Sequence, residues 1–332
     1  MLTDRVKRLS LGHLPTPLHA LPRLSDKLGG LQVFVKRDDQ TGLAMGGNKT
    51  RKLEFLVADA LDRHMDTLIT AGAPQSNHVR QTAAAAARMG LKCVLVLRAD
   101  GQPPAGRQGN LLLDELLGAE IRWAQRQAVE ATMLETANEL SVKGYAPYLI
   151  PYGGSNPIGA TGYVAAMEEL MEQAQHMNLR FDRIVFASSS SGTQAGLVVG
   201  AKVTGYTGQV LGISVDEKRK DLQVKVAKLA IETAAHLGQI MEFAPGDIHV
   251  NADYLGAGYA VMGEPEHQAI RLAAQTEGLL LDPVYTGRAF AGLLDLIRKG
   301  FIRRDETVLF WHTGGTPALF AYAEELAIHG QR

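Results

Sequence analysis

The sequence lacks the features that mark several large classes of protein. Its 332 residues include one cysteine, Cys93, which excludes an intramolecular disulfide and a cysteine-rich metal site. No apolar run approaches the ~20 residues that a membrane-spanning helix needs, and no signal-like apolar segment is expected near the start. With a single thiol, the chain is expected to be cytoplasmic and to have no membrane partner.

The chain also has no excess of charge of either sign. The chain has 34 lysines and arginines against 35 aspartates and glutamates, which gives a formal net charge of −1. A chain near neutrality has no overall field that would hold nucleic acid, so no nucleic-acid partner is expected. The ten histidines include no His-Glu-x-x-His pattern, and no metal site is expected.

Short apolar runs alternate with amphipathic stretches along the whole chain. This order predicts an α/β fold with mostly parallel sheets flanked by helices, and the length suggests about two domains at roughly 150 residues each. Two loops, Ala99–Gly109 and Pro151–Gly162, are candidate domain boundaries. The predicted strands are Leu31–Lys36, Thr67–Ala71, Cys93–Leu97, Arg183–Ala187, Val210–Val215 and Thr307–Trp311. The predicted helices are an apolar stripe from Leu53 to Leu61, Asp114–Leu117, Ala128–Leu140, Gly162–Met177, Gln194–Thr204, Lys218–Leu237, Glu264–Glu277, Gly287–Lys299 and Pro317–Ala327.

The first motif that carries chemistry is Met45-Gly-Gly-Asn-Lys49. The two glycines allow the backbone to approach a ligand, and Lys49 begins a predicted helix. The positive end of the helix dipole and partial burial both lower the pKa of a lysine there, which makes Lys49 a candidate amine nucleophile for a Schiff base. The alternative is a solvated lysine in a basic first turn with Arg51 and Lys52.

A second motif, Ala71-Gly-Ala-Pro-Gln-Ser-Asn-His78, follows a predicted strand and opens an alanine-rich helix. Either Ser76 or Asn77 is a natural N-cap. Free backbone N–H groups together with the serine hydroxyl would bind a carboxylate, although capping alone remains an alternative.

A third motif, Ala187 to Gly196, places four serines, a glycine and a threonine between a predicted strand and a helix. Backbone N–H groups and hydroxyls in such a turn bind phosphate. The motif contains no Gly-Lys-Ser/Thr, so a phosphorylated cofactor fits better than a nucleoside triphosphate. The alternative is an ordinary serine-rich turn.

Two further motifs follow late strands. In Asp282-Pro-Val-Tyr-Thr-Gly287, the phenol of Tyr285 could move a proton, and the alternative is a buried tyrosine with a satisfied hydroxyl. In His312-Thr-Gly-Gly-Thr-Pro317, the glycine pair lets a flat ring approach the backbone, and Thr313 supplies one neutral hydroxyl.

Together these motifs resemble those of pyridoxal-phosphate enzymes of the tryptophan-synthase-β fold type. Within that group the chain is similar to the D-cysteine desulfhydrase and 1-aminocyclopropane-1-carboxylate deaminase family. The resemblance covers nearly the whole chain in order. It runs from LPTPL at 14–18 through VKRDD at 35–39, GGNKTRKLEFL at 46–56, QSNHVRQTAA at 75–84, GGSNPIGATGYV at 153–164, SSGTQAG at 190–196 and LLLDPVYTG at 279–287 to HTGG at 312–315.

The resemblance implies pyridoxal 5'-phosphate as cofactor and a role for each motif. Lys49 would be the Schiff-base lysine, and freed from the cofactor it would remove the Cα proton. Asn77 would contact the ring oxygen and Thr313 the region of the pyridine nitrogen. The phosphate site would be Ser191, Gly192, Thr193, Gln194 and Ala195. The substrate would be held by Gln75, Ser76, Asn77, His78, Tyr285 and Thr286, with Ser76 and Tyr285 also catalytic.

The resemblance also suggests which reaction is favoured. Deaminases that open a cyclopropane ring carry a glutamate directly after the equivalent of Tyr285 and a leucine at the position of Thr313. This chain has Thr286 and Thr313 instead. A carboxylate beside the pyridine nitrogen would deepen the electron sink that ring opening demands, whereas elimination of a good leaving group demands less. The two threonines therefore favour β-elimination from D-cysteine to pyruvate, ammonia and hydrogen sulfide.

Several alternatives stay open at this point. The family also contains lyases that expel sulfite from cysteate, and ring opening of the cyclopropane acid is a weaker possibility. A phosphate-ligand binding protein without turnover would not need both Lys49 and Tyr285. The resemblance further implies a homodimer, with a large cofactor domain from residues 1–50 and 160–332 and a small inserted α/β domain from residues 51–159.

Overall fold

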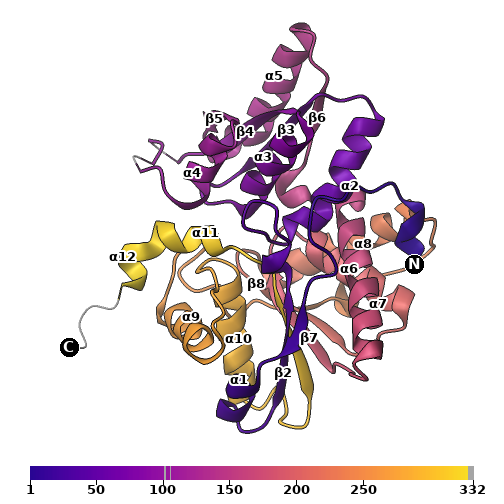
Figure 1. The fold of residues 1–332 in the computed structure, drawn as a ribbon, viewed down its shortest axis with the longest axis vertical. Helices are drawn as coiled ribbons and strands as arrows, with labels where there is room; N and C mark the ends of the chain where they lie inside the picture. Colours follow the sequence, from indigo (N-terminus) through magenta and orange to yellow (C-terminus); the bar gives the residue numbers. More distant parts are fainter. Residues whose placement is uncertain (101, 105, 328–332) are drawn as a thin grey trace.

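Two sheets organise the protein, and each lies in its own lobe of the ribbon in Figure 1. The computed structural model describes residues 1–100, 102–104 and 106–327. In the larger sheet the strand order is β1-β2-β10-β7-β8-β9, and every pair is parallel except β1 with β2. The smaller sheet has the order β5-β4-β3-β6 and is parallel throughout. The strands are β1 (Leu18–Ala20), β2 (Gln32–Arg37), β3 (Thr67–Gly72), β4 (Lys92–Arg98), β5 (Glu120–Ala124), β6 (Pro147–Leu149), β7 (Arg183–Ser188), β8 (Gln209–Ser214), β9 (His249–Asn251) and β10 (Thr307–His312).

Helices cover both sheets, as a parallel sheet requires. All six residues of β3 are buried, Thr67 and Thr70 included, so its sequence shows no alternation of apolar and exposed polar residues. The helices are α1 (Pro22–Lys27), α2 (Lys49–Asp62), α3 (Asn77–Met89), α4 (Gly109–Leu116), α5 (Val129–Val142), α6 (Pro157–His176), α7 (Gly192–Thr204), α8 (Arg219–His236), α9 (Glu264–Glu277), α10 (Thr286–Arg298), α11 (Thr316–Leu319) and α12 (Ala323–Leu326).

The predicted elements are confirmed where the pattern is strong. Each of the six predicted strands is present, with its ends within one residue of the prediction. The strands β1, β5, β6 and β9 were not predicted, because runs of three to five residues carry too little periodicity. The predicted C-terminal helix Pro317–Ala327 is broken into α11, a 3₁₀ turn and α12.

The loop Pro151–Gly162 is shorter than expected. Helix α6 starts at Pro157, because proline fits the first helical position and the side chain of Asn156 accepts a hydrogen bond from Gly159 N at 2.8 Å. The other candidate boundary, Ala99–Gly109, is a loop up to the start of α4 in its described part, and its residues 101 and 105 lie outside the described residues.

Among the described residues, the two sheets share no hydrophobic cluster, and a large one covers a face of each. The first packs β2, β7, β8 and β10 against α9 and α10, and the second packs β3 and β4 against α2 and α3. Two domains, one for each sheet, agree with this division. The exact boundaries at residues 50 and 160 stay a prediction, since α2 and α6 pack along one another across them.

The carboxyl ends of the parallel strands face each other from the two sheets. Residues after β3, β7 and β10 meet there, which is where ligands bind in open α/β sheets. Over the described part of the chain, no helix has both the length and the apolar character that a membrane span requires.

Candidate active site

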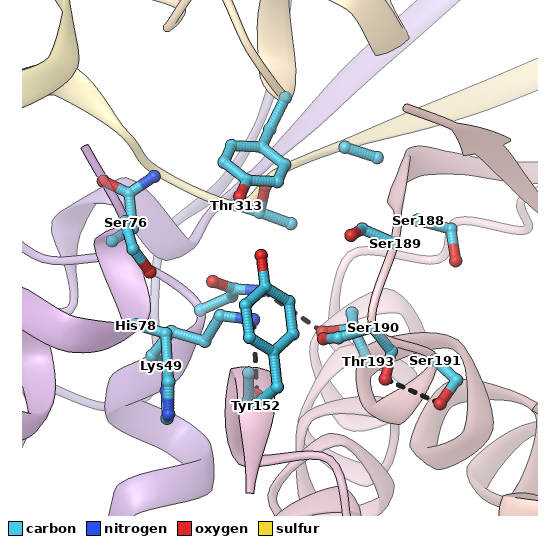
Figure 2. A pocket seen from close by; sticks show the side chains of 15 residues that line it. Lys49, Ser76, His78, Tyr152, Ser188, Ser189, Ser190, Ser191, Thr193 and Thr313 are labelled. Atoms are coloured by element: carbon cyan, nitrogen blue, oxygen red, sulfur yellow. Dashed lines mark hydrogen bonds between the residues drawn. The ribbon is translucent and has the colours of Figure 1, made fainter. Parts of the chain in front are cut away.

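A cavity with about 580 Å³ of empty space, part of it open to solvent, lies between the two sheets. Figure 2 shows the serine turn on one side of the cavity and Lys49, Ser76 and His78 on the other, with the ring of Tyr152 between them. The cavity is lined by Asn48, Lys49, Ser76, Asn77, His78, Tyr152, Gly153, Ala187, Ser188, Ser189, Ser190, Ser191, Thr193, Tyr285 and Thr313.

Two lysines of α2 extend toward this cavity. Lys49 is the first residue of the helix, and Lys52 lies one turn later on the same face. Both ammonium groups contact the carbonyl oxygen of Gly153, at 3.4 Å from Lys49 Nζ and 3.0 Å from Lys52 Nζ. Among the described residues neither lysine has a carboxylate partner within 4 Å.

Burial decides the protonation of these lysines. It lowers the pKa of Lys49 to about 8, while Lys52 and Asp216 partly oppose the shift. Burial, and then the neighbouring charge of Lys49, lower the pKa of Lys52 well below its ordinary value. The predicted depression of the Lys49 pKa is confirmed, and the alternative of a solvated basic turn is wrong because Arg51 and Lys52 are both buried.

The serine turn between β7 and α7 forms an anion cradle opposite the lysines. Ser191 precedes the helix with a φ of +68°, a conformation rare outside glycine, which stores strain at this turn. A Cβ on Gly192 would lie 2.8 Å from Lys52 Nζ and 2.7 Å from Ser155 Oγ. The start of α7, nearby hydroxyls and the amine of Lys52 thus come together, as the binding of a phosphate requires, and the N–H of Gly192 donates to one of these hydroxyls, Ser155 Oγ, at 3.2 Å.

The start of α3 forms the opposite wall. Ser76 is the N-cap, and its hydroxyl oxygen accepts a hydrogen bond from Val79 N at 3.4 Å. Asn77 is oriented by its side-chain oxygen, which accepts from Asn110 Nδ2 at 3.1 Å and from Arg80 Nη1 at 3.4 Å. The amide N–H₂ of Asn77 is therefore left to donate elsewhere.

His78 lies at the same wall as a neutral ring. Thr70 uses its one hydroxyl proton on the carbonyl oxygen of Ile150 at 2.9 Å, so His78 Nε2, at 2.8 Å, must donate to the Thr70 oxygen. Burial, then the charges of Lys49 and Lys52, lower the pKa of His78 well below its ordinary value. Its Nδ1 is buried and has no partner among the described residues, so it remains a free acceptor.

Tyr285 reaches the cavity from the start of α10. The carboxylate of Asp282 accepts hydrogen bonds from the backbone N–H of Val284, Tyr285 and Thr286, which fixes this turn. The Tyr285 hydroxyl is 2.5 Å from the hydroxyl of Tyr259. Burial raises the pKa of both phenols well above the ordinary value, so each keeps its proton at neutral pH.

The remaining wall is the turn after β10. The carbonyl oxygen of Thr313 accepts a hydrogen bond from Asn48 N at 2.9 Å, which ties this turn to the start of α2. Gly314 has a φ of +96°, and a Cβ there would lie 2.6 Å from the Cα of Gly47. Only glycine permits this approach of the two backbones.

Most predicted site residues meet at the cavity, and five do not line it. Gln194 donates its amide to His249 O at 2.8 Å and accepts from Ser188 Oγ at 2.8 Å. Gln75 hydrogen-bonds Asn110 N and Gln108 O, and the Thr286 hydroxyl bonds Asp282. The predicted residues that line the cavity are Lys49, Ser76, Asn77, His78, Ser191, Thr193, Tyr285 and Thr313, and those that do not are Gln75, Gly192, Gln194, Ala195 and Thr286.

Four residues near the cavity were not predicted. The spacing of three residues from Lys49 could have identified Lys52, since both fall on one helix face. Tyr152 and Tyr259 come from irregular segments that carry no periodic signal, and Asp216 begins a charged run that resembles solvated surface. Only the folded chain brings these three to the site.

Comparisons with known proteins show what the whole chain is similar to. A family model described as pyridoxal-phosphate dependent enzyme matches residues 9–314. The D-cysteine desulfhydrase of Salmonella typhi is 46% identical over 326 residues, which cover 96% of this chain and 97% of that protein. The D-cysteine desulfhydrase of Salmonella newport matches with the same identity and coverage.

Solved structures confirm the fold. The crystal structure of an ACC deaminase homologue superposes with a TM-score of 0.90 at 40% identity, covering 98% of this chain and 97% of that one. Threonine deaminase isoform 2 from Solanum lycopersicum has a TM-score of 0.67 at 15% identity, covering 98% of this chain and 84% of that one, and supports the fold alone.

Proposed function

Because the chain belongs to the family of pyridoxal-phosphate-dependent enzymes, we propose that it is a carbon–sulfur lyase that converts D-cysteine and water to pyruvate, ammonia and hydrogen sulfide. The observation that carries this proposal is Lys49, a buried lysine with a pKa of about 8 that faces an anion cradle across the cavity. The D-cysteine desulfhydrases that match nearly the full chain support the choice of substrate.

The residues present fit the cofactor. Two buried ammonium groups without a carboxylate within 4 Å in the described chain call for an anion, and the phosphate would supply it at Lys52 and the start of α7. Asn77, whose side-chain oxygen is already used, would donate to the ring oxygen. Thr313 would lie near the pyridine nitrogen. Because threonine has a hydroxyl and not a carboxylate, it would give that nitrogen no carboxylate partner.

When bound, pyridoxal phosphate supplies an electron sink for the electron pair left at Cα. We assign removal of the Cα proton to Lys49. A lysine whose pKa lies near 8 is partly neutral at working pH and can accept a proton, whereas an ordinary lysine with a pKa of 10.5 would be almost fully charged. The low pKa of Lys49 thus serves both bonding to the cofactor and proton transfer.

The start of α3 would hold the substrate carboxylate. The N–H groups of its first turn and the hydroxyl of Ser76 are oriented toward the cavity, and the positive end of the helix dipole favours an anion there. Residues Gln75 and His78 would support this wall. Thr286 would act through Asp282, to which it is hydrogen-bonded, rather than by contact with substrate.

The protonated pair Tyr285 and Tyr259 would assist the leaving group. As the Cβ–S bond breaks, the sulfur leaves with the electron pair and would take a proton from Tyr285, whose hydroxyl lies 2.5 Å from that of Tyr259. The proton that Lys49 removed from Cα would then restore Tyr285, and water replaces nitrogen at Cα, which yields pyruvate and ammonia and completes the balance.

The test is product analysis of the purified protein loaded with pyridoxal phosphate. D-cysteine should give sulfide and pyruvate in equal amounts, and Lys49→Ala should lower this rate by about 10³-fold or more and remove the visible band of the bound cofactor. L-cysteine, cysteate and 1-aminocyclopropane-1-carboxylate are the comparison substrates. Ammonia formed from the cyclopropane acid alone would contradict the proposal and favour the ring-opening activity named for the ACC deaminase homologue.

We further propose that the enzyme works as a cytoplasmic homodimer. The chain has one cysteine, Cys93, and so forms no intramolecular disulfide, which fits a reducing compartment. Cys93 is buried, and burial raises the pKa of its thiol. Sedimentation equilibrium should give a mass of twice 35.8 kDa, and a monomer at micromolar concentration would contradict the dimer.

A further inference from the structure

We propose that Asp216 selects the substrate by its β-substituent: it admits a neutral thiol and disfavours an anionic group such as a sulfonate. The inference deepens the proposed function and rests on it. It identifies a residue that nothing in the motif pattern assigns to the site and separates D-cysteine from cysteate as substrates.

Asp216 is an exposed residue that lies next to the wall of the active-site cavity. It follows β8, and its Oδ2 accepts a hydrogen bond from Ser189 Oγ at 2.7 Å. Ser189 itself lines the active-site cavity, while Asp216 lines a second, more open cavity of about 1110 Å³. Tyr152 lines both cavities, so the two are adjoining spaces on either side of one ring.

The carboxylate of Asp216 has no ion-pair partner within 4 Å in the described part of the chain. Its neighbour Glu217 lines the same outer cavity and is neutralised by Lys225 at 2.6 Å. One of the two acidic groups at this mouth is therefore paired and the other is not. An unpaired charge beside a partly desolvated pocket acts more strongly on a ligand than a paired one.

The field of Asp216 reaches the reacting groups. Its charge raises the pKa of Lys49 against the larger effect of burial, and it adds to burial in raising the pKa of Tyr285 and Tyr259. An anionic β-substituent would lie among these same side chains and would be repelled.

Two arginines, Arg98 and Arg126, line the outer cavity, and both lower the pKa of Tyr152, for which burial is the main cause of a raised value. Burial raises the pKa of Asp216, and the charge of Arg126 is among the groups that oppose this shift. Arg98 also lies 3.5 Å from Asp100. Arg98 and Arg126 would attract an anion at the outer rim, whereas the carboxylate of Asp216 would repel an anionic β-substituent at the Ser189 side of the active-site cavity.

The test compares Asp216→Asn with a matched control, Glu217→Gln, in the holoenzyme. The kcat/KM ratio of D-cysteine to D-cysteate is measured for each protein. Wild type should favour D-cysteine, Asp216→Asn should reduce that ratio by about tenfold or more, and Glu217→Gln should leave it unchanged because Lys225 already neutralises Glu217. Ser189→Ala, which frees the carboxylate but keeps its charge, should produce an intermediate ratio.

A binding measurement keeps the inference testable without turnover. D-alanine and D-aspartate carry no leaving thiol, and their dissociation constants follow from changes in the visible spectrum of the holoenzyme. Wild type should bind D-alanine more tightly, and Asp216→Asn should reduce this preference about tenfold. If neither D-cysteine nor D-cysteate reacts, the proposed function is wrong, and this binding ratio alone decides the role of Asp216.

Three results would overturn the inference. The first is a wild-type preference for the anionic member of either pair of compounds, which would mean that Arg98 and Arg126 determine the selectivity. The second is an unchanged ratio in Asp216→Asn. The third is an equal change in Glu217→Gln, which would show a general effect of charge at the mouth.

Discussion

Two buried ammonium groups, Lys49 and Lys52, share the carbonyl oxygen of Gly153 in a cavity that gives them no carboxylate within 4 Å in the described chain. At the scale of single residues, this arrangement makes the cofactor-free protein less stable than it could be. The cost is useful because the same burial produces a lysine that is reactive near neutral pH. Function and stability therefore oppose each other at Lys49.

The pH dependence of stability should reveal this cost. The pKa of Lys49 is about 8 in the folded protein and 10.5 ordinarily, so the unfolded chain binds more protons between these values and stability rises with pH there. Cofactor-free Lys49→Met should be more stable than wild type by about 2 to 3 kcal/mol at pH 7, with the difference shrinking toward pH 10.

Urea unfolding at pH 7 and pH 9.5 measures this difference. The control is Lys228→Met on the exposed face of α8. The difference in stability between this variant and wild type should be the same at pH 7 and pH 9.5. A Lys49→Met difference that stays constant with pH would mean that Lys49 has an ordinary pKa.

At the scale of elements, the start of α7 decides whether a phosphate fits. Gly192→Ala would place a Cβ 2.8 Å from Lys52 Nζ and 2.7 Å from Ser155 Oγ. The dissociation constant for pyridoxal phosphate should rise by about tenfold or more, because the methyl group occupies the cradle. A fluorescence titration measures it. Gly246→Ala, where a Cβ meets no atom within 4 Å, is the control, and equal affinities in both variants would contradict the assignment of the cradle.

Asp114, at the contact between α3 and α4, is a second group whose burial costs stability. Both carboxylate oxygens of Asp114 are buried and have no partner among the described residues, and burial raises its pKa to about 8 although Arg80 opposes the shift. The folded state therefore binds more protons between the ordinary value of 3.8 and about 8, and stability falls as pH rises through this range.

Asp114→Asn should remove that loss. The variant should exceed wild type by about 2 kcal/mol or more at pH 8, with a smaller difference at pH 5, in urea unfolding curves. The adjacent exposed Glu115→Gln should change stability little at either pH. A difference that is larger at pH 5 than at pH 8 would disprove the raised pKa.

At the scale of the whole molecule, one buried ion network joins the start of α2 to the larger sheet. Arg51 donates to both oxygens of Asp38, at 2.8 and 2.9 Å, and to Glu169 at 2.9 Å. Asp38 also accepts from Tyr163 and Trp311. Because Arg51 is two residues from Lys49, this network fixes the backbone at Lys49 relative to the larger sheet.

Arg51→Lys should destabilise the protein by about 2 to 4 kcal/mol, since an ammonium cannot replace the planar fork that serves two carboxylates. Burial acts to raise the pKa of Glu169, but Arg51 and Lys36 hold this pKa at about 2. The stability that the Glu169 carboxylate contributes is therefore present above pH 4.5 and is lost as pH falls toward 2. Thermal unfolding at pH 7 and pH 3 should show the larger difference at pH 7. Arg63→Lys, on an exposed pair with Asp59, should be nearly neutral.

The sequence predicted the groups that act locally. Lys49, Ser76, Ser191 and Tyr285 each stand at the start of a helix, where composition and capping rules apply, and all four line the cavity. Gln194 belongs to the same serine motif, yet its amide bonds His249 O beneath the sheet, and a linear motif cannot tell which way a side chain points.

What the sequence by itself determined is the six longer strands, the mostly parallel α/β class and the place of Lys49 at the start of a helix, since each follows from short-range periodicity or from one motif. Only the tertiary structure decided that Tyr259 and Tyr285, 26 residues apart, share a hydrogen bond, and that Asp216 stands beside Ser189. These pairings depend on how two sheets pack, and the packing energy is spread over two hydrophobic cores rather than written in any local segment.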